Sequence, residues 1–449
     1  MSPPFKATHA ATRFGVRHAF LGACALALAG AVTPCRAQGP TPSHAAAVEQ
    51  AVAVDARLVE TATETLLEFD LSRAVEAKAF VLSDPDRVVV ELPEVAFRVE
   101  PDRRAGAKGL VRSYRYGQFA QGRSRVVIDL ARPAKIVRAE AATFSRDGLG
   151  PARLTIALAP DSREAFRAAA RRNAALAQET GSPALPAPER SEKPVVVIDA
   201  GHGGVDSGAI SHAGGDREIL EKTVVLDFAR DLSAALEADG RFKVIMTRSS
   251  DVFVALEDRV RLARSASAAL FVSIHADSLR SAQGVSGATV YTVSDRASDA
   301  EAARIADSEN AADRAAGVDS TETSGDVADI LFDLTRRETR AFAHLFSRDL
   351  VARMSKATTM HKIPNRAAGF KVLKAPDVPS VLIELGYLSS DKDVKAMTSP
   401  DWRARSAQAV AEAIRAFMAP TGAISKAPSP ESEPKGLAGV ATRGVAKAH

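Results

Sequence analysis

The chain has 449 residues, of which 46% are hydrophobic and 25% are charged, proportions that are typical of a soluble globular protein. This length is too great for one ordinary domain and predicts two domains with tails. The formal net charge of +4 comes entirely from residues 1–37, which hold four basic residues and no acidic one. The rest of the chain has 55 basic and 55 acidic residues, so its charge gives no support for nucleic-acid binding.

Residues 1–37 have the pattern of a secretory signal, with a basic start, the apolar run AFLGACALALAGAV and small residues near position 37. The run is too short to cross a bilayer comfortably, so we expect no stable membrane anchor. Cys24 also fits a lipoprotein site, but the apolar run continues past it, which favours ordinary cleavage. Cys24 and Cys35 are the two cysteines of the chain. Their removal would exclude disulfides and thiol catalysis in the mature protein.

Residues 48–160 alternate apolar and polar side chains in eight short runs, from AVAVDARLVE to ARLTIALAP. Period two with short polar breaks predicts an antiparallel β-sandwich. This block contains no histidine or cysteine, which favours a binding module over a metal or nucleophile site. Residues 161–179 can form a helix, and residues 180–194 contain four prolines. We therefore assign residues 161–194 to a linker.

Residues 195–418 change to an alternation of strands and helices. The strand-like runs are VVVIDA, FKVIMTR, ALFVSI, ATVYTV and SVLIEL, and long amphipathic stretches separate them. This order predicts an α/β domain with a mostly parallel sheet flanked by helices. Residues 419–449 show no hydrophobic pattern, and we expect a disordered tail there.

Side chains that can bind a metal or transfer protons follow three strands of this second domain. His202 follows VVVIDAG, His275 follows LFVSI, and Glu384 follows SVLI, while Glu221 begins a helix. Each has an ordinary structural explanation alone, such as a glutamate facing a helix dipole. The carboxyl ends of strands meet at one edge of an open α/β sheet, however, and two histidines with one carboxylate form a catalytic Zn²⁺ site. A second carboxylate can then transfer protons. His361 is a further residue that can line the cleft.

Four blocks of the second domain resemble the zinc-dependent N-acetylmuramoyl-L-alanine amidases of the Amidase_3-like family. They span residues 195–390 in the family's order and read VVVIDAGHGGVDSGAI, EKTVVLDFARDL, LFVSIHADS and NRAAGFKVLKAPDVPSVLIELGYLSS. The resemblance implies that His202, Glu221 and His275 bind one Zn²⁺ per chain and that Glu384 is the catalytic carboxylate. The family usually has Arg-Glu-Lys after the glycine loop. Glu218 is therefore an alternative to Glu221, which we choose because the amphipathic helix follows it in register.

Residues 48–160 resemble the AMIN domain that often precedes such amidases, which implies targeting to peptidoglycan or the cell envelope. The two resemblances imply a periplasmic enzyme that cleaves the amide between N-acetylmuramic acid and L-alanine of the stem peptide. Its expected role is cell-wall remodelling and daughter-cell separation. A zinc peptidase acting within the stem peptide would use the same site residues and is the alternative function. A non-catalytic wall-binding protein fits less well, because all four site residues are present.

An acidic stretch interrupts the second domain after ATVYTV. Residues 295–333 hold 3 basic and 11 acidic residues, and their alanines favour helix. Ile305 is the one large apolar residue in residues 298–317, so we expect a helix that no core face anchors. The stretch is either a solvated surface helix or a plug over the metal site. Resemblance to amidases with a regulatory insertion at residues 295–334 favours Glu309 as the plugging carboxylate, with Glu301 second.

The end of this insertion, GDVADILFDL, predicts a site for an activator. Its apolar stripe would lie on one face of a helix, where a partner can bind by helix-in-groove recognition, and it comprises Val327, Ile330, Leu331 and Leu334. By resemblance, the expected partner is a degenerate LytM-domain protein.

Overall fold

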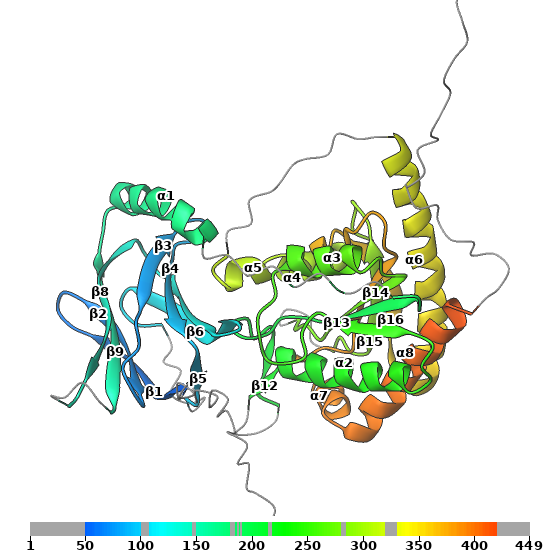
Figure 1. Ribbon diagram of the computed structural model, residues 1–449, viewed down its shortest axis with the longest axis horizontal. Helices are drawn as coiled ribbons and strands as arrows, with labels where there is room; N and C mark the ends of the chain where they lie inside the picture. The colour runs from blue at the N-terminus through cyan, green and yellow to red at the C-terminus, as the bar shows by residue number, and fades with distance from the viewer. Residues whose placement is uncertain are drawn as a thin grey trace, which may run out of the picture. The chain divides into compact units, whose positions relative to one another are not determined.

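The computed structural model describes residues 50–99, 107–145, 150–179, 191–213, 218–279, 284–318 and 330–419, with residues 185 and 188 (Figure 1). The predicted signal segment and the tail from residue 420 lie outside these ranges. Among the described residues, no helix is both long and apolar enough to cross a membrane.

The described part of the first domain forms two antiparallel sheets, as the period-two pattern predicted, with one short parallel pair, β1 with β5. The sheet orders are β5-β1-β2-β9-β8 and β3-β4-β7-β6. Alternate residues of the strands face a shared core, in which Phe69 and Ile128 are fully buried. The strands are β1 (Ala51–Glu60), β2 (Thr65–Leu71), β3 (Lys78–Leu82), β4 (Arg87–Pro93), β5 (Val95–Phe97), β6 (Val111–Ala120), β7 (Arg123–Leu130), β8 (Ala134–Thr143) and β9 (Ala152–Pro160).

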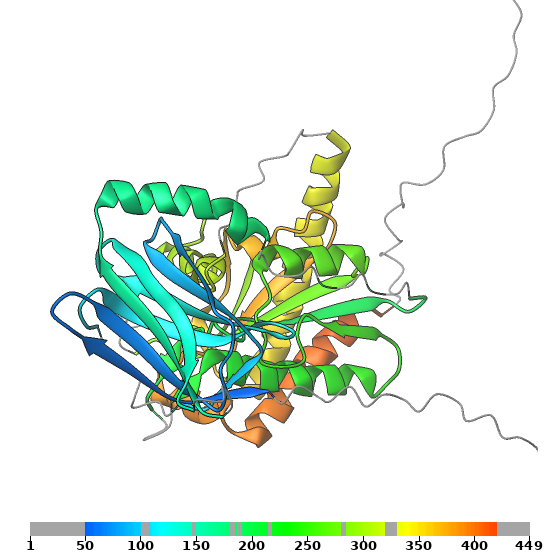
Figure 2. The same cartoon turned by 60° about the vertical axis from the view of Figure 1, so that its left-hand side comes forward.

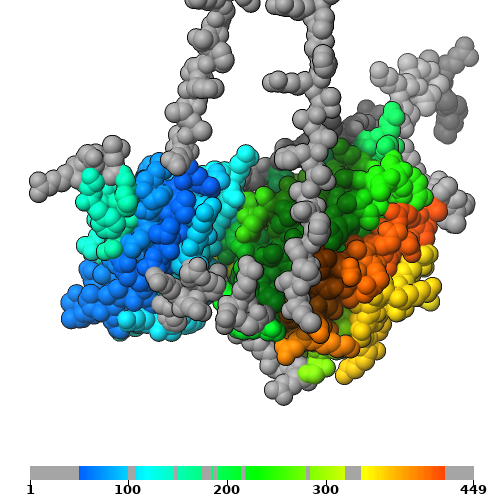
Figure 3. Space-filling view, turned by 90° about the horizontal axis from the view of Figure 1, so that it is seen from below, coloured from blue at the N-terminus to red at the C-terminus, as the bar shows by residue number. Residues whose placement is uncertain are grey.

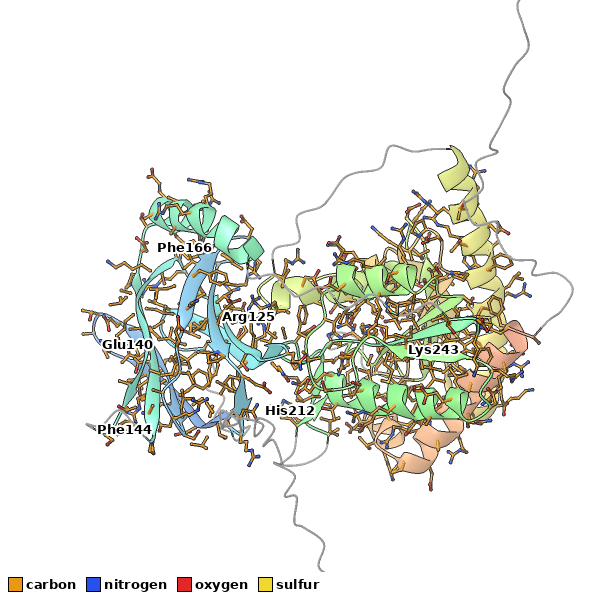
Figure 4. All side chains as sticks on the ribbon, viewed as in Figure 1. Arg125, Glu140, Phe144, Phe166, His212 and Lys243 are labelled. Carbon is orange, nitrogen blue, oxygen red and sulfur yellow. The ribbon has the colours of Figure 1, made fainter. Side chains whose placement is uncertain are left out.

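Helix α1 (Arg163–Glu179) extends the first domain beyond the predicted boundary at residue 160 (Figures 1 and 2). Phe166, labelled in Figure 4, is 1% exposed and belongs to the core of the sandwich together with Ala170. Burial of a phenylalanine stabilises the fold by roughly 1.5–3 kcal/mol. The assignment of residues 161–194 to a linker was therefore wrong for this helix, whose apolar face packs on the sheets.

The second domain is the predicted α/β domain, built on a six-stranded sheet with order β13-β10-β14-β17-β15-β16. Strands β13, β10, β14 and β17 run parallel, while β15 pairs antiparallel with β17 and parallel with β16. The strands are β10 (Val195–Ala200), β11 (Ile210–Ser211), β12 (Ile219–Leu220), β13 (Lys243–Met246), β14 (Leu270–His275), β15 (Ala288–Val293), β16 (Met360–Ala368) and β17 (Ser380–Glu384). The sequence patterns missed β16 and the small pair β11–β12.

Helices cover both faces of this sheet, which explains why every residue of β10 and β14 is buried. Helices α2, α6, α7 and α8 pack on one face, and α3, α4 and the 3₁₀ helix η2 pack on the other (Figure 1). Phe346 of α6 and Phe417 of α8 have ring centroids 5.1 Å apart, and these helices lie side by side in Figure 3. The helices are α2 (Glu221–Glu237), α3 (Leu256–Ser265), α4 (Ala300–Glu309), α5 (Ala312–Ala315), α6 (Ile330–Ala357), η2 (Lys371–Leu373), α7 (Asp391–Met397) and α8 (Pro400–Phe417).

The first part of the acidic stretch forms α4 and α5, but the expectation that no core face anchors its helix was wrong. Ala302, Ile305 and Ala306 are buried in the core on the α3 side of the sheet. Three small or branched side chains at helical spacing are enough to anchor the helix, because alanines allow it to approach the sheet closely. The Asp299 side chain accepts a hydrogen bond from Ala302 N and caps the helix. The predicted boundary of the insertion at residue 334 falls inside α6.

The first and second domains contact each other within one compact unit, Gln50–His449. Phe119 of β6 stacks on Phe253, with ring centroids 5.6 Å apart, and the backbone N–H of Phe253 donates to Gln118 O at 3.3 Å. Val205, which follows the glycines after His202, is buried in the same apolar cluster.

Three arginines of the first-domain sheet also donate to the backbone at the end of α5. Arg87 Nη1 and Arg125 Nη1 do so at 2.5 and 2.9 Å, and Arg115 Nε is the third donor (Arg125 is labelled in Figure 4). The acceptors are the carbonyl oxygens of Arg314 for Arg87, Ala315 for Arg115 and Ala316 for Arg125. Cationic donors at the carbonyl end of a helical segment satisfy oxygens that have no intrahelical partner.

Candidate metal centre

His202 lies on a turn that directly follows β10. Its φ is +56°, a left-handed conformation that non-glycine residues rarely adopt and that is common at functional sites. Arg259 Nη2 donates to His202 O at 2.9 Å, and His202 Nδ1 lies 2.9 Å from Asp206 Oδ2. The carboxylate of Asp206 thereby fixes the orientation of the ring and leaves Nε2 directed away from it.

His275 and Glu221 reach the same place from other elements. His275 is the last residue of β14, the strand beside β10. Glu221 is the first residue of α2, and its Oε1 and Oε2 accept from Ala276 N and Ala209 N, both at 2.8 Å. The alternative residue, Glu218, is not part of this cluster.

The side chains of His202, Glu221, His275 and Glu309 converge as one buried group, with one ligand atom from each within 4.8 Å of all the others. His202 Nε2 lies 3.1 Å from Glu221 Oε1 and 3.3 Å from Glu309 Oε2. His275 Nδ1 lies 3.3 Å from Glu221 Oε1 and 2.9 Å from Glu309 Oε2. These spacings suit donor atoms that surround a single cation.

Electrostatics supports a cation between these four residues. Burial lowers the pKa of His275, but the carboxylates of Glu309 and Glu221 outweigh burial and raise the pKa to about 10. Burial raises the pKa of Glu309, but His275 and His202 outweigh burial and lower it to about 2. His202 Nε2, His275 Nδ1 and Glu309 Oε2 are buried, and none has a hydrogen-bond partner among the residues that the structure describes. Two histidines and two carboxylates therefore need shared protons or a metal ion, and this donor set fits Zn²⁺.

Gly208 shows how closely the backbone encloses the site. Its φ is +62°, and a Cβ at this position would lie 2.6 Å from Glu221 Oε2 and 2.7 Å from His202 Cδ2. A side chain here would displace two of the four clustered residues, so the sequence GVDSGAI after His202 needs glycine at this position.

Glu384 lies next to the cluster but outside it. It is the register neighbour of His275 on the adjacent strand, and its Oε2 accepts from Asp277 N at 2.9 Å. Oε1 is buried and has no hydrogen-bond partner in the described structure. Burial, the largest effect, raises the pKa of Glu384 well above its ordinary value. Glu384 is thus a carboxyl group with one free oxygen beside the candidate metal centre.

The structure adds residues that the sequence analysis missed and leaves others undescribed. Asp206 and Arg259 orient His202, and the only sequence signal was the polar character of VDSG after the histidine. His361, whose place in the cleft was left open, is buried with its Nε2 3.9 Å from a Glu301 carboxylate oxygen. Of the predicted activator stripe, Val327 lies outside the described residues. The stripe's other three residues begin α6 without described side chains, so that prediction stays untested.

Comparison with known proteins shows the family to which this chain belongs. The family model "N-acetylmuramoyl-L-alanine amidase" matches residues 196–416, and the AMIN domain model matches residues 55–158. The chain is 32% identical over 401 residues to the amidase AmiC of Escherichia coli O6:H1, covering 85% of this chain and 92% of that one. AmiC of Neisseria meningitidis is 32% identical over 382 residues, covering 81% and 89%. The solved structure of AmiC2 from Nostoc punctiforme covers 51% of this chain and 98% of that one, at 29% identity and a TM-score of 0.33.

A buried cluster of histidines and carboxylates at one edge of an α/β sheet has the donor set that metal-dependent hydrolases use. The chain belongs to the family of N-acetylmuramoyl-L-alanine amidases, with an AMIN domain before the catalytic domain. The predicted family and reaction, cleavage of the amide between N-acetylmuramic acid and L-alanine in peptidoglycan, are confirmed.

Proposed function

We propose that this amidase depends on zinc, with His202, Glu221 and His275 as the ligands. The convergence of their buried nitrogen and carboxylate atoms carries the proposal. When bound, the ion supplies Lewis-acid polarisation of the amide carbonyl and activation of water. Glu221 is held through both of its oxygens by backbone N–H groups, so its carboxylate is oriented before any ion binds.

Glu384 is the proposed proton-transfer residue. Its free Oε1 can accept a proton from the attacking water and return it to the nitrogen of L-alanine as the C–N bond breaks. One water is consumed, its oxygen remains on the lactyl group as a carboxylate, and the stem peptide leaves with a free amino group. The hydrogen bond from Asp277 N holds the other oxygen, which leaves Oε1 to face the reaction.

Glu309 is the proposed plug. Its carboxylate lies among the three proposed ligands, at 3.3 and 2.9 Å from the two imidazoles, and α4 is anchored to the sheet by Ile305. A carboxylate in this place takes the coordination position that water and substrate need. The enzyme would then rest in a closed form until α4 moves.

We place the enzyme in the periplasm, with peptidoglycan as substrate in cell-wall remodelling and daughter-cell separation, and with a LytM-domain protein as activator. The predicted secretory signal and the AMIN domain support this setting. To raise the open form from ~1% to ~99%, an activator must prefer it by about 10⁴-fold, ~5.5 kcal/mol. Ile330→Asp in the proposed docking stripe should abolish activation and leave the low basal rate unchanged. Full activation of this variant would contradict the docking site.

Digestion of purified peptidoglycan tests the proposed function directly. Mass spectrometry should show intact stem peptides with a free N-terminal L-alanine, and a zinc chelator should abolish their release. Fragments cut within the stem peptide would instead indicate a peptidase. Full activity after metal removal, verified by elemental analysis, would contradict zinc dependence.

A further inference from the structure

Helix α4 has a second acidic contact with the domain, at the end opposite Glu309. Arg366 Nη1 of β16 donates to Glu301 Oε1 at 2.5 Å, and Arg366 Nε lies 3.5 Å from Asp299 Oδ2. Arg366 Nη2 also lies 3.3 Å from His361 Nδ1. The Arg366 side chain is only 2% exposed, and Nε has no hydrogen-bond partner in the described structure. A buried guanidinium thus depends on a carboxylate of the plug segment, by which we mean α4 with its N-cap residue Asp299.

Arg366 faces the same side of the sheet as Glu384. Arg366 pairs with Tyr291 on β15, and Tyr291 pairs with Leu382 on β17, two residues before Glu384. Paired residues and residues two apart on a strand share a face. Arg366 lies two strands from Glu384 across the sheet, at about 4.8 Å per strand, and two residues from it along the strand direction, at about 3.3 Å per residue. Their Cα atoms are therefore about 12 Å apart.

The two carboxylates on α4 have a matching separation. Glu301 and Glu309 are eight residues apart, which is about 12 Å along a helix. One lies in the candidate metal centre and the other at Arg366, so α4 occupies both places together. Since Asp299 and Glu301 both belong to the plug segment, Arg366 loses both carboxylate partners when that segment leaves. Its guanidinium would then lie beside His361 without either of these counter-charges.

We propose that Arg366 and His361 form a carboxylate-binding subsite for the stem peptide, and that Glu301 imitates the substrate there. This inference rests on the proposed plug. An extended peptide spans about 3.3–3.6 Å per residue, so a carboxylate 12 Å from the scissile amide belongs to the third or fourth residue of the stem. The planar guanidinium suits a carboxylate because it can donate two parallel hydrogen bonds.

Soluble muropeptides with a free or an amidated carboxylate at the third or fourth residue test the subsite. The full-length Glu309→Ala variant is the enzyme, because a larger fraction of its molecules than of the wild type is expected to be open. Free-carboxylate substrates should have a KM about 10-fold lower than amidated ones. Arg366→Gln, added to this variant, should raise KM for the free substrate about 10-fold, leave kcat within about 3-fold and remove the preference between substrates. Lys362→Gln, an exposed cation on the same strand, is the matched control and should change neither value.

Equal KM values for free and amidated substrates with Arg366 intact would overturn the subsite, and this comparison needs no folded Arg366 variant. A rise in KM that is equal for both substrates in Arg366→Gln would also overturn it, because that pattern indicates a structural role. Failure of the Glu309→Ala enzyme to cleave either substrate would instead contradict the proposed function and the plug.

Discussion

Replacing Glu309 by alanine removes the carboxylate that lies among the proposed zinc ligands while leaving the anchor of α4 in place. The residue is 4% exposed, and Oε2 approaches both imidazoles, at 3.3 and 2.9 Å. Ile305 and the alanines of α4 remain buried, so the helix should stay folded on the sheet in most molecules. The expected result is a higher basal activity without any partner protein.

The size of this effect follows from the contacts that are lost. The lost contacts are ion pairs at 3.3 and 2.9 Å, and polar contacts with charged groups stabilise a folded arrangement by about 1.5–3 kcal/mol, which is about 10- to 150-fold in an equilibrium constant. If ~1% of the wild type is open, the open fraction of Glu309→Ala rises to between ~10% and ~60%. Basal activity should therefore increase about 10- to 60-fold, without exceeding the rate of the fully activated enzyme.

The assay is release of stem peptides from purified peptidoglycan at equal protein and equal bound zinc. Asp307→Ala is the matched control, because it removes the same charge from an exposed position of α4 and should change the rate less than 2-fold. A deletion of residues 298–334 that still folds and binds zinc gives the rate of the open form. If Glu309→Ala stays at the wild-type rate while the deletion is active, Glu309 is not the plugging group.

Three further predictions concern the metal centre, the core and the first domain. His202→Ala should lose both metal and activity, whereas Glu384→Gln should lose activity alone; elemental analysis decides, and metal loss in Glu384→Gln would contradict proton transfer as its role. Burial raises the pKa of Asp199, but the ion pair with Arg259 and two buried hydroxyls outweigh it and hold the pKa below 3.8. The ionised carboxylate therefore stabilises the fold above pH 3.8, and this stabilisation is lost as the pH falls through the pKa of the folded state. The thermal midpoint of the wild type should fall more steeply in acid than that of Asp199→Asn. Parallel acid profiles of the two proteins would count against this. Deleting residues 38–180 should spare metal binding and cleavage of soluble muropeptides but weaken binding to sacculi, and a truncated protein without zinc would show that the domains are not independent.

The strands that could be predicted are those whose own residues determine their burial. Runs such as VVVIDA are continuously apolar because helices cover both sheet faces. Strand β16 could not be predicted in this way, since MHKIPNRAA is polar and contains Pro364. It is the edge strand of its sheet and needs only β15 as a neighbour, and such pairing does not appear as a local pattern.

The part of the candidate site that could be predicted is the part that the order of the strands brings together. His202 and His275 follow neighbouring parallel strands, so their meeting at one sheet edge follows from the fold class. Arg259, which lies on α3, donates to the carbonyl oxygen of His202, 57 positions earlier in the chain. No periodic pattern in the sequence marks such a hydrogen bond. The anchoring of α4 was missed because its buried face is mostly alanine, which a search for large apolar residues ignores.

The arginines of the first-domain sheet couple that domain to the opening of the plug. Arg87, Arg115 and Arg125 donate to carbonyl oxygens at the end of α5, and α5 follows Glu309 by only a few residues. If the plug carries α5 with it when it leaves, these hydrogen bonds break. Any wall component that binds the first domain more tightly after they break would then favour opening, and opening would strengthen its binding by the same factor. Binding to the wall and the start of cleavage would then both depend on the same equilibrium between the closed and open forms.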